Sequence, residues 1–380
     1  MSNWEIVDEQ KGNASIKVIG VGGGGGNAVQ HMVEAGIEGA DFIAVNTDKQ
    51  ALDQNGAKTK LVLGMDLTDG LGAGANPQVG REAALEDRDK LRDMLKGTDM
   101  VFVTAGMGVG TGTGAAPIVA QVAKELGILT VAVVTKPFEI EGSKRMQIAK
   151  DGIKELVDEV DSLITIPNEK LLEELGEDFT VLEAFQEAND VLAGAVRGIS
   201  DIIIKPGLIN VDFADVKTVM SEKGTAMMGT GTSSGPDRAR IAAEHAVASK
   251  LLEDISLQDA KGVLVNITAG KDLSLGEIKI VGECIKEFAS EEAIVIQGTV
   301  LDESAGNDLT VTVIATGLGS SIQRSSNLRS VSGIDGAAST INDESRKYLE
   351  NPPKTVNDSA IDKIDDDYLD IPSFVRTQLD

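Results

Sequence analysis

The sequence predicts an α/β protein with a doubly wound parallel sheet in its first half. Short apolar runs rich in Val and Ile alternate there with segments of helical period, and glycine-rich turns follow two of these runs. Buried parallel strands joined by helices give this pattern. A long apolar helical segment then precedes a second set of runs. The 380 residues therefore have room for a sheet domain, a central helix and a smaller α+β domain.

The elements follow in order along the chain. Strands of the first domain are predicted at residues 16–21, 42–46, 100–105, 128–135 and 162–166. A helix over 180–205 carries apolar residues on more than one side, which indicates burial between two bodies. In the second domain we expect helices at 236–252 and 275–289 and strands at 262–268, 293–300 and 309–316.

The charge balance narrows the class of partner. The chain has 35 Lys and Arg against 61 Asp and Glu, a net charge of −26. A surface this negative repels nucleic acid and anionic lipid, so we expect no direct nucleic-acid binding and membrane contact only through partners. No signal peptide pattern is present, and no apolar run approaches the roughly 18 residues that span a bilayer. These features predict a soluble, cytoplasmic protein.

The cysteine and histidine residues do not form a recognisable catalytic or metal-binding pattern. Cys284 is the only cysteine, which excludes an internal disulfide. His31 and His245 each lie in a helical segment without a second ligand type at metal spacing. The sequence therefore predicts neither a Ser-His-Asp triad nor a metal site built from protein side chains.

Three glycine-rich loops are the most informative motif. They are GGGGGN at residues 22–27, GAGANP at 72–77 and GVGTGTG at 108–114. Glycines let a backbone approach an oxyanion, threonine hydroxyls add donors, and the first turn of a following helix presents free N–H groups. Three such loops close together in the chain predict several walls of one polyphosphate pocket.

The first loop also fits a dinucleotide-binding fold. Gly20, Gly22 and Gly25 satisfy G-x-G-x-x-G after a strand. That fold expects an acid at the end of the second strand, where this chain has Asn46, with Asp48 two residues on. An NAD(P)-dependent oxidoreductase therefore stays an alternative. A P-loop NTPase is not expected, because G-x-x-x-x-G-K-[ST] does not occur.

An acidic motif, NVDFAD at residues 210–215, directly follows the predicted central helix. If Phe213 begins a helix, Asp212 is its N-cap and Asp215 lies in its first turn, which is a structural role. The alternative is that the paired carboxylates and an amide position a water and a cation for attack on a phosphate. Because the motif is far from the glycine loops in sequence, such a site would need the chain to fold back or a second subunit to complete it.

The two ends of the chain differ from the rest. Residues 1–14 are polar and predicted to be flexible, and residues 319–364 read as a disordered linker, since they are too polar to bury much surface. An apolar cluster then returns within residues 365–380, in YLDIPSFVR. A linker that ends in such a cluster predicts a docking peptide that becomes ordered on a partner.

Taken in order, the motifs resemble the tubulin/FtsZ family. They are GGGGGN, VNTD, GAGANP, GTGTGAAP, KPFEIEGSKR, FQEAND and NVDFADV, and the resemblance covers residues 15–318 and the C-terminal peptide. It implies a tubulin-like fold with a GTP-binding domain over 15–180, a central helix over 181–205 and a GTPase-activating domain over 206–318. It further implies head-to-tail polymerisation into the ring of bacterial cell division, at mid-cell. A tubulin-like filament that segregates DNA is a second alternative, which the C-terminal peptide disfavours.

The resemblance also implies roles for individual residues. The glycine loops would hold the phosphates of GTP or GDP, Glu141 and Arg145 would meet the ribose, and Asn168, Phe185, Asn189 and Asp190 would face the guanine. The implied GTP-binding residues are Gly23, Gly24, Gly25, Gly26, Asn27, Asn46, Gly72, Ala73, Gly74, Gly108, Val109, Gly110, Thr111, Gly112, Thr113, Glu141, Arg145, Asn168, Phe185, Asn189 and Asp190.

Catalysis and partner binding are implied in the same way. Asn210, Asp212 and Asp215 would reach the pocket of the next subunit, Mg²⁺ would bridge phosphate oxygens, and K⁺ is a further candidate cation. Membrane-anchoring and regulatory division proteins would bind the C-terminal peptide through Leu369, Asp370, Ile371, Pro372, Phe374 and Val375.

One residue departs from the family. Val109 stands where glycine is usual, inside the third glycine loop. A positive φ at this position would strain a β-branched residue by about 1–3 kcal/mol and would predict weaker nucleotide binding or turnover, whereas a negative φ would make valine harmless. The sequence leaves both outcomes open.

Overall fold

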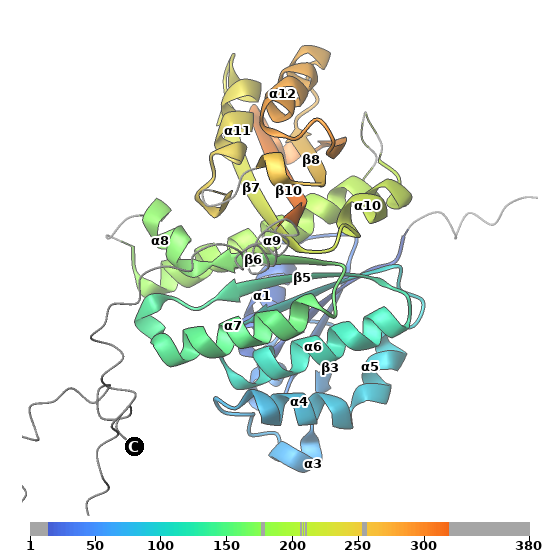
Figure 1. Ribbon diagram of the computed structural model, residues 1–380, viewed down its shortest axis with the longest axis vertical. Helices are drawn as coiled ribbons and strands as arrows, with labels where there is room; N and C mark the ends of the chain where they lie inside the picture. Colours follow the sequence, from blue (N-terminus) through green and yellow to red (C-terminus); the bar gives the residue numbers. More distant parts are fainter. Residues whose placement is uncertain are drawn as a thin grey trace, which may run out of the picture. The chain divides into compact units, whose positions relative to one another are not determined.

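Strands and helices alternate along the computed structural model of the chain, which describes residues 14–175, 179–205, 207, 209, 211–252 and 257–318 (Figure 1). The segments expected to be a flexible N-terminus, a disordered linker at 319–364 and a docking peptide at 365–380 lie outside the described residues, apart from residue 14. None of the described helices is long and apolar enough to cross a membrane.

The described strands form one sheet in the order β3-β2-β1-β4-β5-β6-β7-β10-β8-β9. Pairing is parallel from β3 to β7, antiparallel on both sides of β10, and parallel again between β8 and β9. The strands are β1 (Ile16–Val21), β2 (Asp41–Asn46), β3 (Thr59–Val62), β4 (Met100–Gly106), β5 (Leu129–Lys136), β6 (Ser162–Pro167), β7 (Thr225–Ser234), β8 (Gly262–Ala269), β9 (Ile294–Leu301) and β10 (Asp308–Leu318).

Helices connect these strands. The α-helices are α1 (Gly22–Glu34), α2 (Lys49–Gln54), α3 (Met65–Thr68), α4 (Pro77–Glu86), α5 (Arg88–Leu95), α6 (Gly110–Glu125), α7 (Ser143–Val157), α8 (Asn168–Leu175), α9 (Val181–Ile204), α10 (Phe213–Met220), α11 (Arg238–Val247) and α12 (Leu275–Phe288). Short 3₁₀ turns are η2 (Glu139–Glu141), η3 (Lys250–Leu252), η4 (Leu257–Asp259) and η5 (Glu303–Ala305).

Alternate residues of the parallel strands feed two different cores. On one face, Val18 and Phe102 pack with α1 and α9 in a single apolar cluster. On the other face, Ile19 and Val103 pack with α4, α5, α6 and α7. Because strand side chains point alternately to opposite faces, strands that are buried throughout need helices on both sides. The predicted doubly wound arrangement is confirmed for this half of the sheet.

Helix α9 links the two halves of the fold (Figure 1). Its buried residues, among them Val196 and Ile199, share one core with Phe102 of β4 on one side and with Leu264 of β8 on another. Thr180 caps its start in a reciprocal capping box with Glu183. The helix runs at the predicted position and is buried between two sets of strands, as its apolar pattern indicates.

Two strands were not expected from the sequence, β3 and β7. β7 has an atypical strand composition because it must let α11 lie against it. A side-chain carbon on Gly229 or Gly231 would fall about 2.0 or 2.2 Å from a carbonyl oxygen of α11. Glycine permits this close approach at the cost of an ordinary strand pattern. β7 also pairs briefly with β6, so the second domain continues the first sheet.

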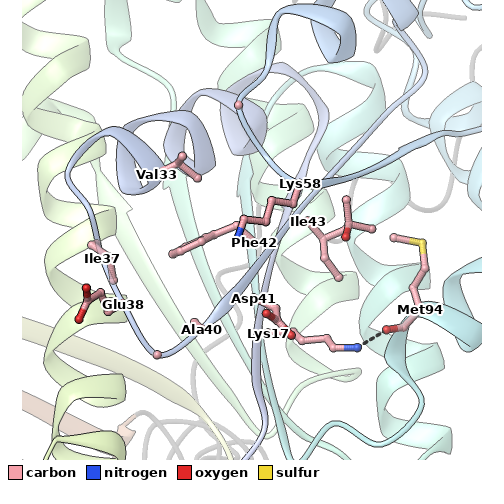
Figure 2. Close-up of a pocket in the computed structure, with 13 residues that line it drawn as sticks. Lys17, Val33, Ile37, Glu38, Ala40, Asp41, Phe42, Ile43, Lys58 and Met94 are labelled. Atoms are coloured by element: carbon pink, nitrogen blue, oxygen red, sulfur yellow. Dashed lines mark hydrogen bonds between the residues drawn. The ribbon is translucent and has the colours of Figure 1, made fainter.

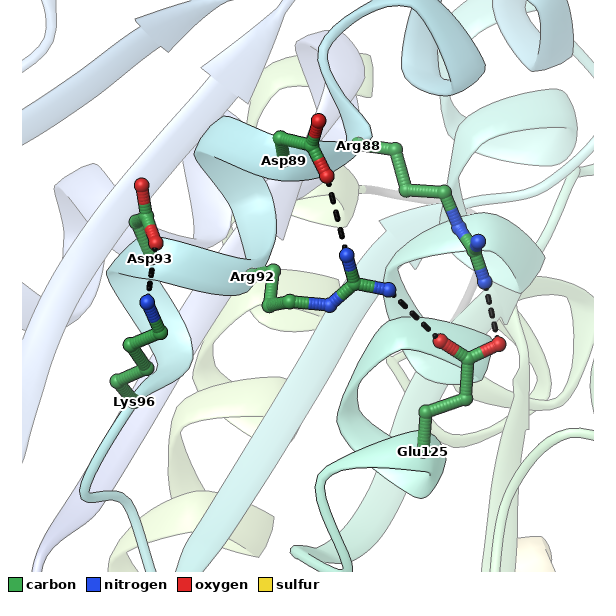
Figure 3. A network of polar contacts seen from close by, with 6 residues as sticks. All are labelled: Arg88, Asp89, Arg92, Asp93, Lys96 and Glu125. Carbon is green, nitrogen blue, oxygen red and sulfur yellow. Dashed lines mark hydrogen bonds and ion pairs between the residues drawn. The ribbon is translucent and has the colours of Figure 1, made fainter.

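A polar network holds α5 against α6 (Figure 3). Glu125, the last residue of α6, pairs with Arg88 and with Arg92, whose second nitrogen lies 3.0 Å from Asp89. The Arg88 hydrogen bond, with a smaller contribution from Arg92, lowers the pKa of Glu125. A carboxylate at a helix C-terminus is unfavourable by itself, and the two guanidinium groups offset it. The network thereby supports the far end of the helix whose first turn lies at the candidate site.

Candidate functional site

The candidate site lies at the carboxyl ends of β1 and β4, which are neighbours in the sheet. Helix α1 leaves β1 toward one face, and α6 follows β4 toward the other. A crevice opens where consecutive helices diverge in this way, and open α/β sheets bind ligands there. The first turns of α1 and α6 both present N–H groups that have no partner within the helix. The topology alone therefore places two of the glycine loops at a ligand-binding position.

The three glycine loops meet in space. A side-chain carbon on Gly22, whose φ is +72°, would lie 2.7 Å from the amide nitrogen of Gly112. The N–H of Gly110 donates to the carbonyl of Gly74 at 3.2 Å, and a carbon on Gly110 would lie 2.4 Å from the same oxygen. Only glycine allows these backbones to approach so closely. The loops at 22–27, 72–77 and 108–114 are thus parts of one structure.

A cavity of about 410 Å³ opens beside these loops. Nine of the residues predicted for nucleotide binding line it: Gly23, Gly24, Asn27, Val109, Glu141, Arg145, Asn168, Phe185 and Asn189. The volume lies in the range of small-molecule and cofactor sites. Residues from α1, the β4–α6 loop, η2, α7, α8 and α9 converge here, although they are up to 166 positions apart (Gly23 and Asn189).

Two polar atoms in the cavity wall lack partners. Asn168 is 4% exposed, and its Oδ1 has no hydrogen-bond partner, nor does Nε of Arg145. Buried polar atoms are rarely left unpaired unless a ligand or water completes them. Both atoms belong to residues that line the same cavity.

The wall formed by Glu141 and Arg145 is held by its own contacts. Nη1 of Arg145 lies 2.7 Å from Oε2 of Glu141, whose Oε1 accepts from the N–H of Phe138 at 2.8 Å. Phe138 is buried and meets the ring of Phe185 edge to face, with centroids 5.2 Å apart. Phe185 itself is 43% exposed at the cavity. An exposed ring backed by a buried one is a surface on which a planar base can stack.

The threonine hydroxyls of the third loop have partners within the protein. The hydroxyl of Thr113 accepts from the N–H groups of Gly108 and Val109 at 2.9 and 3.1 Å. The hydroxyl of Thr111 is paired with that of Thr47 at 2.7 Å. These contacts shape the loop and engage the N–H groups of Gly108 and Val109, while that of Gly110 donates to Gly74.

Val109 is not strained. Its φ of −125° and ψ of −179° are extended backbone that any residue adopts. Gly108 carries the positive φ, +102°, and a side-chain carbon there would lie 2.8 Å from the carbonyl oxygen of Arg145. Of the two alternatives that the sequence left open, the structure supports the harmless one.

The other predicted nucleotide residues surround the cavity without lining it. Gly25 packs against the carbonyl of Thr104, Gly26 accepts from Asn55, and Asn46 accepts from the N–H of Asp48 at 3.3 Å. The same holds for Gly72, Ala73, Gly74, Gly108, Gly110, Thr111, Gly112 and Thr113, which form the loops described above. Asp190 bonds to His31 of α1 through a 2.6 Å contact.

The acidic residues are separate from the cavity. Asp212 caps α10, since its Oδ1 accepts from the N–H of Asp215 at 2.9 Å, and both side chains are exposed. The structural role proposed for Asp212 from the sequence is therefore present. Asn210 lies outside the described residues, as do Leu369, Asp370, Ile371, Pro372, Phe374 and Val375.

Several residues that line the cavity were missed by sequence reasoning: Gly106, Met107, Thr135, Pro137, Ala188 and Leu192. Thr135 lies near the carboxyl end of β5, beside β4, so the strand order would have indicated it. Ala188 and Leu192 lie on the same side of α9 as Phe185, at helical spacing. Lys136, between Thr135 and Pro137, does not line the cavity; burial, and secondarily Lys150, lowers its pKa.

A second cavity, of about 670 Å³, lies at the opposite ends of the strands (Figure 2). It is lined by Lys17, Asp41 and Thr59, near the amino ends of β1, β2 and β3, and Nζ of Lys17 donates to the carbonyl of Met94 at 2.5 Å. Ligands of open α/β sheets bind at the carboxyl ends, so this cavity is not the candidate nucleotide site.

Within the described residues, no three His, Cys, Asp or Glu side chains form a cluster that could hold a metal ion.

Comparison with known proteins agrees with the geometry. The family model of the Tubulin/FtsZ family, GTPase domain, matches residues 15–176, and that of the FtsZ family, C-terminal domain, matches 224–319. The cell division protein FtsZ of Pseudomonas aeruginosa is 58% identical, with 99% of this chain and 100% of that protein aligned. The same protein of Coxiella burnetii is also 58% identical, with 98% of each covered.

Solved structures give the same result. An empty FtsZ dimer from M. jannaschii superposes with a TM-score of 0.79 at 43% identity, covering 82% of this chain and 90% of that one. CetZ2 from Haloferax volcanii, in a GTPγS-bound protofilament, has a TM-score of 0.69 at 20% identity, covering 83% and 97%, and shows likeness in fold alone. The tubulin-like fold is confirmed, and the chain belongs to the tubulin/FtsZ family, within its FtsZ branch of cell division proteins.

Proposed function

We propose that the chain is a GTP-dependent polymerising GTPase whose hydrolytic site forms between two copies. One observation carries this proposal: the cavity and the acidic residues lie at different ends of α9. Leu192, the last residue of α9 that lines the cavity, precedes Ile204 at the helix end by 12 positions, or about 18 Å at 1.5 Å per residue. A rigid, buried helix keeps the two sites apart within one chain. A second chain, docked head to tail, can supply the carboxylates.

In this proposal the cavity binds GTP through separate groups. The loop segments at residues 23–27 and 110–113 hold the phosphates, and residues 72–74 lie near the terminal one. Glu141 and Arg145 contact the ribose. Asn168, Phe185 and Asn189 surround the guanine, and Asp190, next to them, accepts from its N1–H and N2–H groups. Adenine lacks this pair of donors, so the carboxylate would select guanine.

The neighbouring copy then provides Asp212 and Asp215, with Asn210 beside them. Their carboxylates polarise a water for in-line attack on the terminal phosphate. Mg²⁺, held by phosphate oxygens, offsets the charge that develops in the transition state, and K⁺ is a further candidate. Both Asp212 and Asp215 are exposed, as side chains that must enter another subunit have to be.

The wider cellular role follows from the family. Filaments of this chain would organise the cytokinetic ring at mid-cell, in the cytoplasm. The C-terminal peptide would bind membrane-anchoring and regulatory division proteins, and the strongly acidic chain would not bind nucleic acid directly. Neither an NAD(P)-dependent oxidoreductase nor a DNA-segregating filament is favoured by the family matches.

Sedimentation tests the proposal most directly. With GTP the chain should pellet as polymer, and with GDP it should stay in the supernatant. GTP turnover per chain should be near zero in dilute solution and rise steeply above a threshold concentration. Turnover per chain that stays constant over a hundredfold dilution would mean that one subunit contains the whole site.

A mixing experiment tests the shared site more sharply. Asp215→Ala keeps a sound cavity, and Gly23→Glu keeps sound acids but places a negative charge in the cavity. No atom lies within 4 Å of a side-chain carbon built on Gly23, so this variant has room for its side chain. An equimolar mixture should recover turnover above the sum of the two variants alone. A mixture that is only additive would contradict a site shared between copies.

A further inference from the structure

Strand β9 is the edge of the sheet, and the connection from α9 to α10 lies against it. The N–H of Ile209 donates to the hydroxyl oxygen of Thr299 at 2.9 Å, and the N–H of Thr299 donates back to the carbonyl of Ile209 at 3.3 Å. Thr299 is 2% exposed. A reciprocal pair of hydrogen bonds in a buried place fixes the position of one loop residue relative to the strand.

The residues on either side of Ile209 tighten this contact. A side-chain carbon on Gly207 would lie 1.7 Å from the carbonyl oxygen of Thr299. On the strand, a carbon on Gly298 would lie 3.2 Å from Cγ2 of Val211, which is itself buried. Loop residues 207 and 209 thus lie against Thr299, and residue 211 lies against its neighbour Gly298. Glycine on both sides lets the backbones come this close.

The connection is also tied at its beginning. Nζ of Lys205 donates to Oδ2 of Asp201 at 2.9 Å, and the Asp201 side chain is 5% exposed. At the other end, Asp212 follows Val211 directly and caps α10. Ile209, the residue that Thr299 holds, therefore lies three residues before Asp212 and six before Asp215. Helix α10, which carries Asp215, also packs into the core through Val216 and Val219.

We infer that Thr299 is a positioning residue for the acidic motif: its hydroxyl holds Ile209, and thereby sets where Asp212 and Asp215 stand when they enter the pocket of another copy. The inference rests on the proposed function. Thr299 touches neither substrate nor water in it. Catalytic groups misplaced by about 1 Å can lose roughly a hundredfold in rate, so a hydrogen bond at this distance from the chemistry matters.

Two substitutions at Thr299 separate the effect of its hydroxyl group from the effect of its side-chain packing. Thr299→Val keeps the shape and removes the acceptor, whereas Thr299→Ser keeps the acceptor and removes a methyl group. We expect Thr299→Val to lower GTP turnover in filaments by about tenfold or more, and Thr299→Ser to stay within about twofold of the unchanged chain. GTP affinity, measured below the assembly threshold, should be the same for all three, because the cavity is not touched.

Each other outcome is informative. Equal turnover for Thr299→Val and the unchanged chain, or equal losses for both variants, would overturn the positioning role of the hydroxyl. An unchanged chain without GTP turnover would contradict the proposed function as well, so the two failures are distinguishable. If Thr299→Val does not fold, Gly298→Ala displaces the loop instead, because its side-chain carbon would lie 3.2 Å from Cγ2 of both Val211 and Ile202. Turnover should then fall in Gly298→Ala while GTP affinity stays the same, and unchanged turnover would overturn the inference.

Discussion

Nε2 of His31 lies 2.6 Å from Oδ1 of Asp190, and this contact joins the helix that begins at the first glycine loop to the helix that carries Phe185 and Asn189. One carboxylate oxygen of Asp190 is engaged in the pair, and the other remains for a ligand. His31 therefore orients the residue that we propose as the guanine acceptor.

From this contact we predict that His31→Ala weakens GTP binding by the dilute chain by about three- to tenfold, since one charge-assisted hydrogen bond is worth about 1 kcal/mol or more. His31→Gln, which can still donate, should lose less. Titration with a fluorescent GTP analogue below the assembly threshold measures both. His245→Gln, exposed on α11, is the matched control. Unchanged affinity in His31→Ala would show that Asp190 needs no partner.

The loop at Val109 gives a paired prediction. Val109→Gly should leave GTP affinity within about twofold, because valine is in an extended conformation. Gly108→Ala should weaken binding by one or more powers of ten, since it combines a φ of +102° with a contact to the Arg145 carbonyl, a cost of about 1–3 kcal/mol. The same titration checks both variants. A marked gain in affinity for Val109→Gly would show that valine distorts the loop after all.

Asp212 has one observed role, as the cap of α10, and one proposed catalytic role, and substitution can separate them. Asp212→Asn keeps an oxygen that can cap α10 but loses the charge, so thermal stability should be retained while GTP turnover falls by about two powers of ten. Asp212→Ala should lose turnover equally and also about 1 kcal/mol of stability through the missing cap. Calorimetry and phosphate release distinguish the two. Loss of GTP binding by the dilute Asp212→Asn chain would contradict a site that is separate from the cavity.

Arg238 governs the acid stability of the second domain. Its side chain is 5% exposed and contacts Glu277 and Asp272 at 2.6 and 2.9 Å, together with the carbonyl of Asn307. The Arg238 hydrogen bond is the main cause of a lowered pKa at Glu277. A lowered folded-state pKa stabilises the protein above the unfolded value, near 4.3, and this contribution is lost as the pH falls through the folded value.

Arg238→Gln should therefore lower the thermal midpoint at pH 7 and cost about 3 kcal/mol in stability, because Glu277, which is 17% exposed, loses its ion pair with a buried guanidinium. The difference from the unchanged chain should narrow as the pH falls below the unfolded value, near 4.3, because protonation of Glu277 removes its ion pair with Arg238. Thermal unfolding across this pH range provides the test. Arg240→Gln, on the same helix but 70% exposed, is the control and should change little. A difference that is constant with pH would exclude this ion pair as its cause.

The sequence predicted what depends on short-range pattern. Apolar runs predicted the parallel strands, and the acidic motif predicted Asp212 as the cap of a helix that begins at Phe213. Strand β7 was not predicted, because Gly229 and Gly231, which let α11 lie against it, depart from an ordinary strand pattern. The hydrogen bonds of the Thr113 hydroxyl were not predicted either, since its partners are two loop amides whose positions depend on how the loop turns.

The same limit applies to the candidate site. Glycine loops show in the sequence that a phosphate can be held, but not that Gly74 meets Gly110. Thr299 has no sequence signal, because it lies 90 positions from Ile209 and only the fold brings the two together. Long-range contacts of this kind can be identified only in the folded structure.

The C-terminal peptide gives the last prediction. A chain that ends at residue 367 should hydrolyse GTP and pellet with GTP as the full chain does, because no residue proposed for the cavity or the acidic motif is removed. It should no longer bind a membrane-anchoring division protein, since exposed apolar side chains gain most from a groove on a partner. Replacing Leu369, Ile371 and Phe374 together by Ser in the full chain is the matched control, and it should abolish binding to the same extent while leaving the length unchanged. Fluorescence anisotropy with the purified anchoring protein measures both. Full affinity in the truncated chain would place the docking surface elsewhere, and full affinity in the Ser variant alone would mean that residues other than the apolar ones carry the contact.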